Sequence, residues 1–352
     1  PNNLSTKQGT VRGVVISEDT TAVSGVNNLR FSQLFGVSTD TVKFRYNNTD
    51  GVRVTDQTNG DKFGNALDID GGYTVIAGAP EFDDNLSDEG TTVEKVGAVA
   101  VYNFNQTELG GSPRQIGNWL IAANAYRSTE DYSAPMDDPL ISGNYYNQFN
   151  NAKFGHSVGI NEEGTKIVVG CPGHAMPSFG DTWSRDLGAI FAYRLIQRPI
   201  DEVAKGTDGM KWEQITIDGP NGNSFQEQHG YSVAMSKDGN YIVVGAPFYG
   251  TTFTPGTDGY HLGRVSVYEL KRIPGRTTFD GTVVPDIYKY ELRCPKIVGR
   301  YANDKFGHDV SISENGGVIL VSSLDHDGRA RDVEGKGHGR VQLFKWSGSA
   351  YI

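Results

Sequence analysis

One short stretch of the chain matches a pattern known from catalytic serines. Residues 155–159 read Gly-His-Ser-Val-Gly, which is the Gly-x-Ser-x-Gly spacing. That spacing needs a sharp strand-to-helix turn that exposes the serine hydroxyl. Here Ser157 falls inside a predicted strand, and related segments of the chain have Ala66, Ser232 and Asp309 at the same place. The repeated pattern explains the match, so we predict no catalytic serine.

Carboxylates form the second group of residues that could do chemistry. Glycoside hydrolysis requires two carboxyl groups that face each other across a cleft. Loop acids that could serve as acid and base are Asp83, Asp84, Asp137 and Asp138. Loop acids are abundant in this chain, and the sequence singles out no pair among them. A polysaccharide-active enzyme is therefore the alternative function, not the preferred one.

Two acidic clusters could bind a metal ion. One holds Asp83, Asp84, Asp88 and Glu89, and the other holds Asp325, Asp327 and Asp332. Calcium takes six to eight oxygen ligands, which such compact runs of carboxylates supply. Asp325, Asp327 and Asp332 are the candidate calcium ligands, and solvated loop acids are the favoured interpretation. The sequence indicates no other cofactor.

Composition excludes several classes of partner. The chain has 352 residues and a formal net charge of −10, with no basic stripe that could neutralise phosphates. We therefore expect no nucleic-acid partner. No apolar run reaches 18 residues, so we expect no membrane insertion. Two cysteines are too few for a disulfide framework, and we expect Cys171 to be a small buried residue.

Four copies of one sequence unit organise most of the chain. Each copy opens near a Phe-Gly pair or its equivalent, continues through a short polar turn into an apolar run, and ends in an alternating strand that carries Tyr or Phe. The copies begin at Phe63, Phe154, His229 and Phe306. A fixed order at a roughly constant period is the signature of a repeat architecture.

The strand pattern within each unit predicts the fold class. The second strand of each unit is apolar throughout, as in residues 167–169 and 242–244, which indicates burial on both faces. We predict an all-β protein, a β-propeller of four-stranded antiparallel blades, with a linear solenoid as the competing arrangement. The predicted blades span about 58–123, 152–217, 228–293 and 304–352, within a propeller over 58–352.

Residues 1–57 contain no clear copy of the unit. Alternation and β-branched content predict strands at 11–16, 41–46 and 51–55. The last copy stops without a fourth strand, and residues 41–56 stand where a fourth strand belongs. This N-terminal segment is therefore predicted to complete the last blade. Because the chain begins at Pro1, a processed chain or a piece of a longer one is expected.

The repeated motifs resemble those of a known family. Phe63-Gly64 with Gly78-Ala79-Pro80, Phe154-Gly155 and Gly245-Ala246-Pro247 are similar to FG-GAP repeats, the blades of the integrin α-subunit propeller and of microbial and viral surface proteins. The resemblance covers about residues 58–346 and implies a propeller whose loop-bearing face contacts ligand. Integrin-type blades bind calcium through an Asp-x-Asp-x-Asp-Gly turn. The turns here are shorter and poor in acids, so those sites are not carried over.

Topology indicates which surface carries the long loops. Successive antiparallel strands reverse direction, so the loops between second and third strands leave from the same end as the connections between units. Long loops on a rigid scaffold are common binding sites, and exposed aromatic side chains suit protein or glycan ligands. The candidate ligand-binding residues are Tyr126, Tyr132, Tyr145, Tyr146, Trp183, Tyr249, Phe253 and Tyr260. Equivalent positions predicted to form a ring near the inner strands are Asn65, His156, Tyr231 and His308.

These observations lead to one functional expectation and two alternatives. We expect a non-enzymatic binding or adhesion module on a cell surface or virion, with a protein or glycan ligand on the loop-bearing face. The first alternative is the glycan-active enzyme described above. The second is a purely architectural subunit of an appendage or particle, whose loops meet neighbouring subunits. All three imply an extracellular location.

Overall fold

The computed structural model describes most of the repeat region. It covers residues 62–352 apart from 86–91, 104–113, 118–119, 122–148, 178–182, 185, 198–208, 220–221, 223–225, 278, 280–282, 285 and 327–336. Before residue 62 it describes four short strands, β1 (Thr10–Val11), β2 (Val14–Glu18), β3 (Leu29–Gln33) and β4 (Val42–Lys43). Among the described residues, no helix is long and apolar enough to cross a membrane.

The repeat region folds into four antiparallel sheets, here called blades 1 to 4. Blade 1 contains β5 (Ala66–Ile69), β6 (Thr74–Ala79), β9 (Ala98–Asn103), β10 (Arg114–Gln115) and β11 (Leu120–Ile121). Blade 2 contains β12 (Ser157–Ile160), β13 (Lys166–Cys171), β16 (Ala189–Gln197) and β17 (Met210–Ile217). Blade 3 contains β18 (Ser232–Met235), β19 (Tyr241–Ala246), β20 (Arg264–Ile273), β23 (Ile287–Leu292) and β24 (Ile297–Val298). Blade 4 contains β25 (Phe306–Ile312), β26 (Val318–Ser323) and β27 (Arg340–Lys345).

Three small hairpins extend from the blades. They are β7 (Asp84–Asn85) with β8 (Thr92–Val93), β14 (Met176–Pro177) with β15 (Trp183–Ser184), and β21 (Arg276–Thr277) with β22 (Val283–Val284). The first two lie between the second and third strands of blades 1 and 2. The third lies between β20 and β23 of blade 3.

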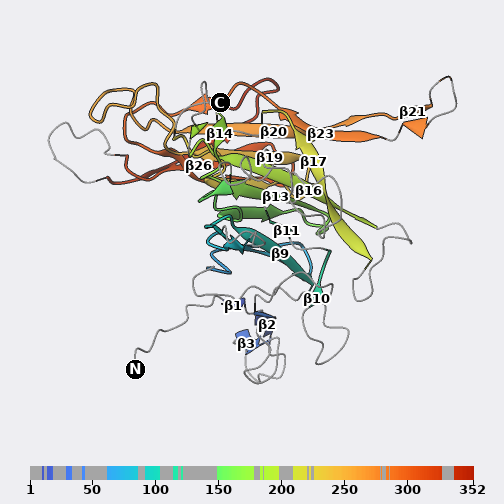
Figure 1. Ribbon diagram of the computed structural model, residues 1–352. Coiled ribbons are helices and arrows are strands. Elements are labelled where there is room, and N and C mark those ends of the chain that lie inside the picture. Colours follow the sequence, from blue (N-terminus) through green and yellow to red (C-terminus); the bar gives the residue numbers. More distant parts are fainter. Residues whose placement is uncertain are drawn as a thin grey trace, which may run out of the picture.

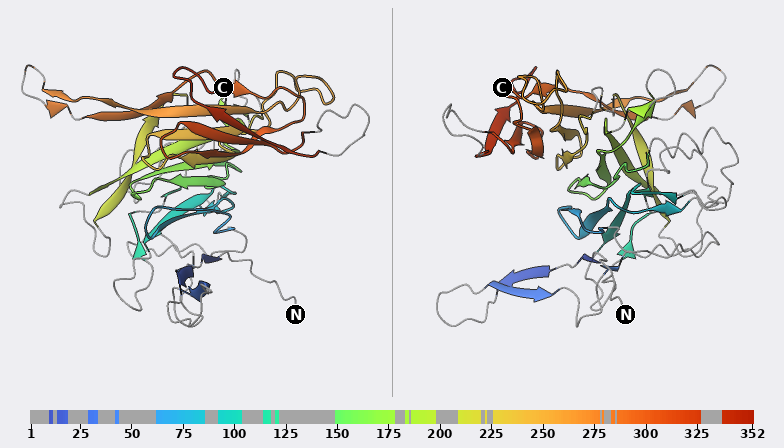
Figure 2. Two further views of the ribbon diagram at one scale, coloured as in Figure 1. Left: turned by 180° about the vertical axis from the view of Figure 1, so that it is seen from behind. Right: turned by 60° about the vertical axis from the view of Figure 1, so that its left-hand side comes forward.

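The blades follow one another in chain order around their inner strands. Figures 1 and 2 show the sheets in succession from blade 1 to blade 4. The inner strand of each blade contacts the next, so that β5 meets β12, β12 meets β18 and β18 meets β25. A parallel pairing of β17 with β23 also joins the outer strands of blades 2 and 3. The fold is all-β and propeller-type, as the sequence predicts.

Burial follows the sequence pattern in the middle of the array. Ile167, Val168 and Val169 of β13 are fully buried, because blades 1 and 3 cover both faces of blade 2. Among the described residues, blade 1 and blade 4 each contact one other blade. Leu67 of blade 1 is 53% exposed and Leu320 of blade 4 is 41% exposed. The prediction that every second strand is buried on both faces is therefore wrong for blade 4.

Glycine pairs form the joint between successive blades. The carbonyl oxygen of Gly155 lies 2.0 Å from the position that a Cβ on Gly78 would occupy, and Gly230 stands 2.1 Å from the same position on Gly170. Any side chain on Gly78 or Gly170 would overlap the next blade. Gly155 also has φ +86°, which favours glycine. The first glycine of one unit and the Gly-Ala glycine of the preceding unit thus form one contact.

Blade 4 departs from this joint on its outward side. Ser322 stands where blades 2 and 3 have Gly170 and Gly245, and its hydroxyl accepts a hydrogen bond from the Asp309 backbone at 2.9 Å. Asp309 itself stands where blades 2 and 3 have a serine. The outward face also carries Val341 and Leu343, which are 70% and 63% exposed. Blade 4 therefore presents an apolar face without the glycine that receives a neighbour elsewhere.

The turns between first and second strands are closed by polar side chains. Asn161 Oδ1 accepts hydrogen bonds from the backbone of Thr165 at 2.9 Å and Lys166 at 2.7 Å. In blade 1, Asp70 Oδ1 accepts one from Thr74 at 2.8 Å. These side chains satisfy backbone donors that a tight turn leaves open.

The N-terminal strands pair among themselves where they are described. β4 pairs with β1, and β2 pairs with β3. The rest of the predicted strand region at 41–56 lies outside the described residues. Completion of the last blade by this segment therefore stays a prediction.

Candidate functional site

The structure places the loops between second and third strands and the connections between blades at one end of the array. In blade 2, Ser157 at the start of the first strand pairs with Gly170 at the end of the second. Backbone hydrogen bonds then join neighbouring blades at this end. Lys153 donates to Lys95 at 2.9 Å, and Lys305 donates to His261 at 3.2 Å. The prediction that both sets of loops share one face is confirmed for these segments. We call this end the loop end.

Six aromatic and imidazole rings form a continuous cluster at the loop end. His156, Tyr231 and His308 begin the inner strands of blades 2, 3 and 4, and Tyr231 lies between the two histidines with ring centroids 4.9 Å and 5.2 Å away. Phe248, 5.9 Å from Tyr231, connects these rings to His261 and Tyr260 of the blade 3 loop. We call these six residues the ring cluster. The predicted contact between equivalent positions is confirmed for three of them, whereas Asn65 is exposed.

The histidines of the ring cluster include two that are held neutral. Burial lowers the pKa of His156 to about 4, with smaller contributions from the positive charges of Lys153 and Lys62. Burial also lowers the pKa of His261, and Lys305 adds to the effect. Near pH 7 the two imidazoles are therefore uncharged and can pack against the neighbouring rings. All six side chains of the cluster remain partly accessible to solvent.

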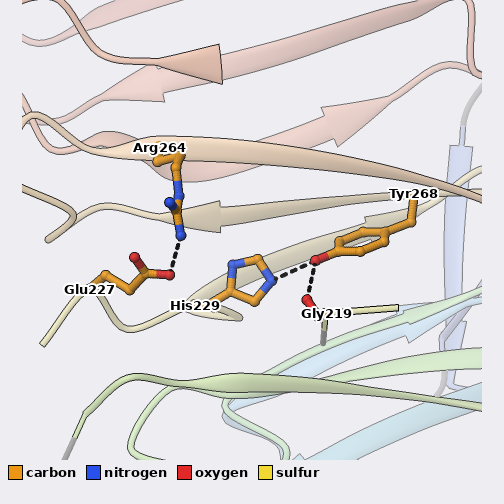
Figure 3. A network of polar contacts seen from close by, with 5 residues as sticks. All are labelled: Gly219, Glu227, His229, Arg264 and Tyr268. Atoms are coloured by element: carbon orange, nitrogen blue, oxygen red, sulfur yellow. Dashed lines mark hydrogen bonds and ion pairs between the residues drawn. The ribbon is translucent and has the colours of Figure 1, made fainter. Parts of the chain in front are cut away.

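A buried polar network supports the blade 3 part of this end (Figure 3). Arg264 of β20 forms an ion pair with Glu227, and both side chains are nearly or fully buried. The guanidinium carbon of Arg264 also lies 4.3 Å from the Tyr249 ring centroid, a cation–π contact. Glu227 therefore fixes Arg264, and Arg264 positions the aromatic side chain at the base of the 247–263 loop.

The second half of the network joins His229 to Tyr268. The Tyr268 hydroxyl donates to the Gly219 carbonyl at 2.9 Å and lies 3.2 Å from His229 Nε2. Because the hydroxyl proton is directed at Gly219, His229 Nε2–H is the donor to tyrosine. Burial, followed by the charges of Lys296 and Arg264, holds the pKa of His229 well below its usual value. His229 is thus a neutral structural group.

The predicted ligand-binding residues have different environments. Tyr249 is half-buried over Arg264, and Tyr260 stacks on His261 with centroids 3.7 Å apart. Phe253 is 61% exposed on the same loop. Trp183 belongs to β15, but its side chain lies outside the described residues, as do Tyr126, Tyr132, Tyr145 and Tyr146. The structure therefore brings Tyr249 and Tyr260 into one loop and leaves the role of the other positions as a prediction.

The candidate calcium ligands are only partly described. Asp325 forms an ion pair with Lys305 at 2.6 Å, and the adjacent His326 bonds to Asp304 at 3.0 Å. Asp327 and Asp332 lie outside the described residues. Within the part of the chain that the structure describes, no three histidine, cysteine or acidic side chains gather closely enough to hold a metal ion. A calcium site stays a prediction.

The candidate catalytic residues have structural partners where they are described. Ser157 Oγ donates to the Gly230 carbonyl at 2.9 Å, and Ser232 Oγ makes the equivalent bond to Gly307. The serine thus belongs to the blade joint. Asp83 Oδ1 accepts the Lys95 backbone N–H at 2.7 Å. The side chains of Asp84, Asp137 and Asp138 lie outside the described residues.

Sequence reasoning missed the buried network and, in the ring cluster, the contacts that Phe248 and His261 make. A comparison of the copies position by position contains a signal for the network, because Arg264 stands where blades 1 and 2 have Ala98 and Ala189. A charge in place of a buried alanine requires a buried partner. Phe248 and His261 carry no such signal, since their loop differs in composition from its counterparts.

Comparisons with known proteins add little to this picture. No protein-family model matches the chain, and no curated protein matches it. Among solved structures, the periplasmic gluconolactonase PpgL of Pseudomonas aeruginosa matches 54% of this chain and 38% of its own length, with 16% identity and a TM-score of 0.26. The tricorn protease matches 80% of this chain and 21% of its own length, with 11% identity and a TM-score of 0.34. The chain thus spans well under half of either protein, and these similarities carry no argument about activity.

Proposed function

We propose that this chain is a non-enzymatic binding module of the FG-GAP propeller type, displayed on a cell surface or a virion. The ring cluster at the loop end is the observation that carries the proposal. Three successive blades contribute to it, its rings are partly accessible, and a buried ion pair supports the adjoining loop. Rigid aromatic side chains on a fixed scaffold lose little conformational freedom when they bind a ligand, which favours recognition.

The chemistry of the described residues favours binding over catalysis. The serine of the Gly-x-Ser-x-Gly stretch bonds to the next blade, and Asp83 bonds to backbone. Two histidines of the ring cluster are neutral, and three described carboxylates, Glu81, Asp325 and Asp304, are bound to lysine or histidine. The cluster can therefore offer stacking surfaces and hydrogen bonds to a ligand.

A glycan array with the purified chain tests this proposal. We expect binding to a defined subset of glycans, with no release of shortened products from them. Tyr231→Ala removes the central ring and should abolish binding while leaving the melting temperature within a few degrees. A matched control is Tyr73→Ala, which removes an exposed tyrosine at the opposite end of blade 1. Product release would instead support the glycan-active alternative, and equal binding by both variants would refute the assignment of this face.

The architectural alternative has its own measurement. If neighbouring subunits occupy the loop end, sedimentation of the isolated chain should show an oligomer that Tyr231→Ala dissociates. The binding proposal expects the same sedimentation coefficient for both proteins. An assembly that depends on Tyr231 would therefore overturn it.

A further inference from the structure

Lysine recurs at one structural position of the repeat. The residue before each Phe-Gly pair or its equivalent is Lys62, Lys153, Gln228 or Lys305. All four have positive φ, between 51° and 58°. A positive φ is unfavourable for most residues. Glycine adopts it readily, and asparagine does so to a lesser degree. The repeated choice of lysine there suggests that the ammonium groups, rather than backbone stability, determine the residue.

The joint between blades 1 and 2 gathers two of these lysines, Lys62 and Lys153, together with Lys95. Lys95 also has positive φ, at 50°, and its carbonyl accepts the backbone N–H of Lys153 at 2.9 Å. Lys62 forms an ion pair with Glu81 at 2.7 Å. Lys62, Lys95 and Lys153 all lower the pKa of Glu81, chiefly through the Lys62 hydrogen bond. We call these three residues the lysine cluster.

Two described carboxylates lie beside the cluster: Glu81, and Asp83, whose Oδ1 accepts the Lys95 backbone N–H at 2.7 Å. Glu81 is the ion-pair partner of Lys62. Neither Lys95 nor Lys153 has an ion-pair partner for its ammonium group within the described part of the chain. The ammonium groups of Lys95 and Lys153 are therefore available to an anionic ligand, and the positive charges of Lys153 and Lys62 act on the neighbouring His156.

The lysine cluster adjoins the ring cluster. The backbone N–H of His156 donates to the Lys153 carbonyl at 3.0 Å, so a single tight turn separates the lysine from the first imidazole ring. On the far side of the ring cluster, Lys305 Nζ lies 5.7 Å from the Phe248 ring centroid. Lysine side chains thus border the aromatic surface on two sides, and Lys305 is paired with Asp325.

We propose that the loop end binds an anionic saccharide, whose carboxylate or sulfate groups contact Lys95 and Lys153 while a sugar ring packs against His156 and Tyr231. This inference rests on the proposed binding function and names its ligand class. An ammonium–carboxylate or ammonium–sulfate contact is a charge-assisted hydrogen bond. The apolar face of a pyranose matches the partly exposed rings. Combining the two contacts selects acidic sugars over neutral sugars and over small anions.

Titration calorimetry with defined oligosaccharides tests the proposal. The probes are a galacturonic acid tetrasaccharide for carboxylates, a heparin-derived tetrasaccharide for sulfates, and maltotetraose as the neutral reference. We expect one of the two anionic probes to bind, with an affinity that falls as salt is raised, and maltotetraose to bind at least about tenfold more weakly. Which anionic probe binds distinguishes the carboxylate from the sulfate source.

The double variant Lys95→Gln/Lys153→Gln separates this inference from the general binding function. Glutamine is tolerated in this backbone conformation, because Gln228 adopts it at the equivalent position with φ 54°. We expect affinity for the anionic probe to fall at least about tenfold. The control Lys166→Gln/Lys237→Gln removes the same charge at the opposite end of the blades, where Lys237 pairs with Glu162 at 3.4 Å, and should leave affinity unchanged.

The outcomes are distinguishable. If the neutral probe binds as well as the anionic ones, or if both double variants weaken binding equally, the anionic-saccharide inference is wrong while a glycan-binding face survives. If Tyr231→Ala leaves binding of every probe unchanged, the proposed function of the loop end fails as well. Absence of binding by the wild-type chain to all three probes contradicts the inference directly.

Discussion

The equivalent aromatic pockets of blades 2 and 3 have the same ring geometry but different residues and hydrogen bonds. In blade 2, Phe154 meets Tyr193 edge to face with centroids 6.5 Å apart. In blade 3, His229 meets Tyr268 in the same arrangement at 6.3 Å. The Tyr193 hydroxyl has no hydrogen-bond partner within the described residues, whereas Tyr268 contacts both Gly219 and His229.

The comparison shows which parts of the repeat are fixed and which can vary. The glycine joint is the same at both blades, because Gly155 approaches Gly78 as Gly230 approaches Gly170. The backbones lie so close together at these positions that no side chain larger than the hydrogen of glycine fits. The side chains around the joint can change together, provided that each buried polar group gains a partner. Blade 3 has a buried polar network where blade 2 has an apolar pocket.

The largest expected effect comes from breaking that network on one side. Glu227→Ala leaves the Arg264 guanidinium buried without its carboxylate and should lower the free energy of unfolding by about 3–5 kcal/mol. The double variant Glu227→Ala/Arg264→Ala, which restores the alanine of blades 1 and 2, should be more stable than the single variant. Urea denaturation measures both. As a control, Glu162→Ala removes an exposed ion-pair partner and should cost no more than about 1 kcal/mol. A double variant less stable than Glu227→Ala would contradict the comparison.

The shared glycine joint should be nearly as sensitive. Gly170→Ala places a methyl group 2.1 Å from the Gly230 carbonyl oxygen, and we expect a loss of about 3 kcal/mol in unfolding free energy. In the turn of blade 1, a Cβ on Gly72 would meet its nearest atom at 3.5 Å. Gly72→Ala should therefore have little effect. Similar denaturation midpoints for the two variants would show that the joint is not fixed by backbone approach.

Much of the fold could be predicted because its determinants are local in sequence. The glycines, the turn side chains such as Asn161 and the apolar second strands recur in each copy and fix the strands they belong to. The exposed face of blade 4 could not be read from the residues, because burial of Leu320 depends on whether another blade stands beside it. For the site, the contact of His156 with Tyr231 followed from their equivalent positions. Phe248 and His261 contact these residues through a loop, and the repeat pattern does not predict the conformation of that loop.

The third prediction concerns pH and blade 2. Burial lowers the pKa of His174 to about 4, and both of its ring nitrogens lack partners within the described residues. In the unfolded chain this histidine has a pKa of about 6.5, so below that pH it binds a proton that it does not bind in the folded chain. The free energy of unfolding therefore falls as the pH drops from about 6.5 toward 4. The contribution of this one histidine at pH 5 is roughly 2 kcal/mol.

The variant His174→Phe tests the size of that contribution. Phenylalanine already occupies the equivalent position as Phe82. At pH 7 the variant should gain about 1 kcal/mol, because two unsatisfied buried nitrogens disappear. Between pH 7 and pH 5 it should lose roughly 2 kcal/mol less than the wild type. Thermal or urea unfolding at the two pH values gives both numbers, and parallel pH profiles for the two proteins would show that His174 is protonated in the fold.

Ser322 stands where the other blades have the glycine that contacts the next blade. The first and last blades of the array therefore differ in their outward faces. Blade 1 has Phe63 and Gly64, the part of the glycine joint that contacts the preceding blade in blades 2 to 4. Blade 4 lacks the glycine that forms the other part of the joint. A duplicated copy of the unit placed after blade 4 would meet a hydroxymethyl group and the negative charge of Asp309. A further unit packed against blade 4 in the same way would therefore require glycine in place of Ser322, whereas a unit inserted between two of the other blades would meet the glycine joint.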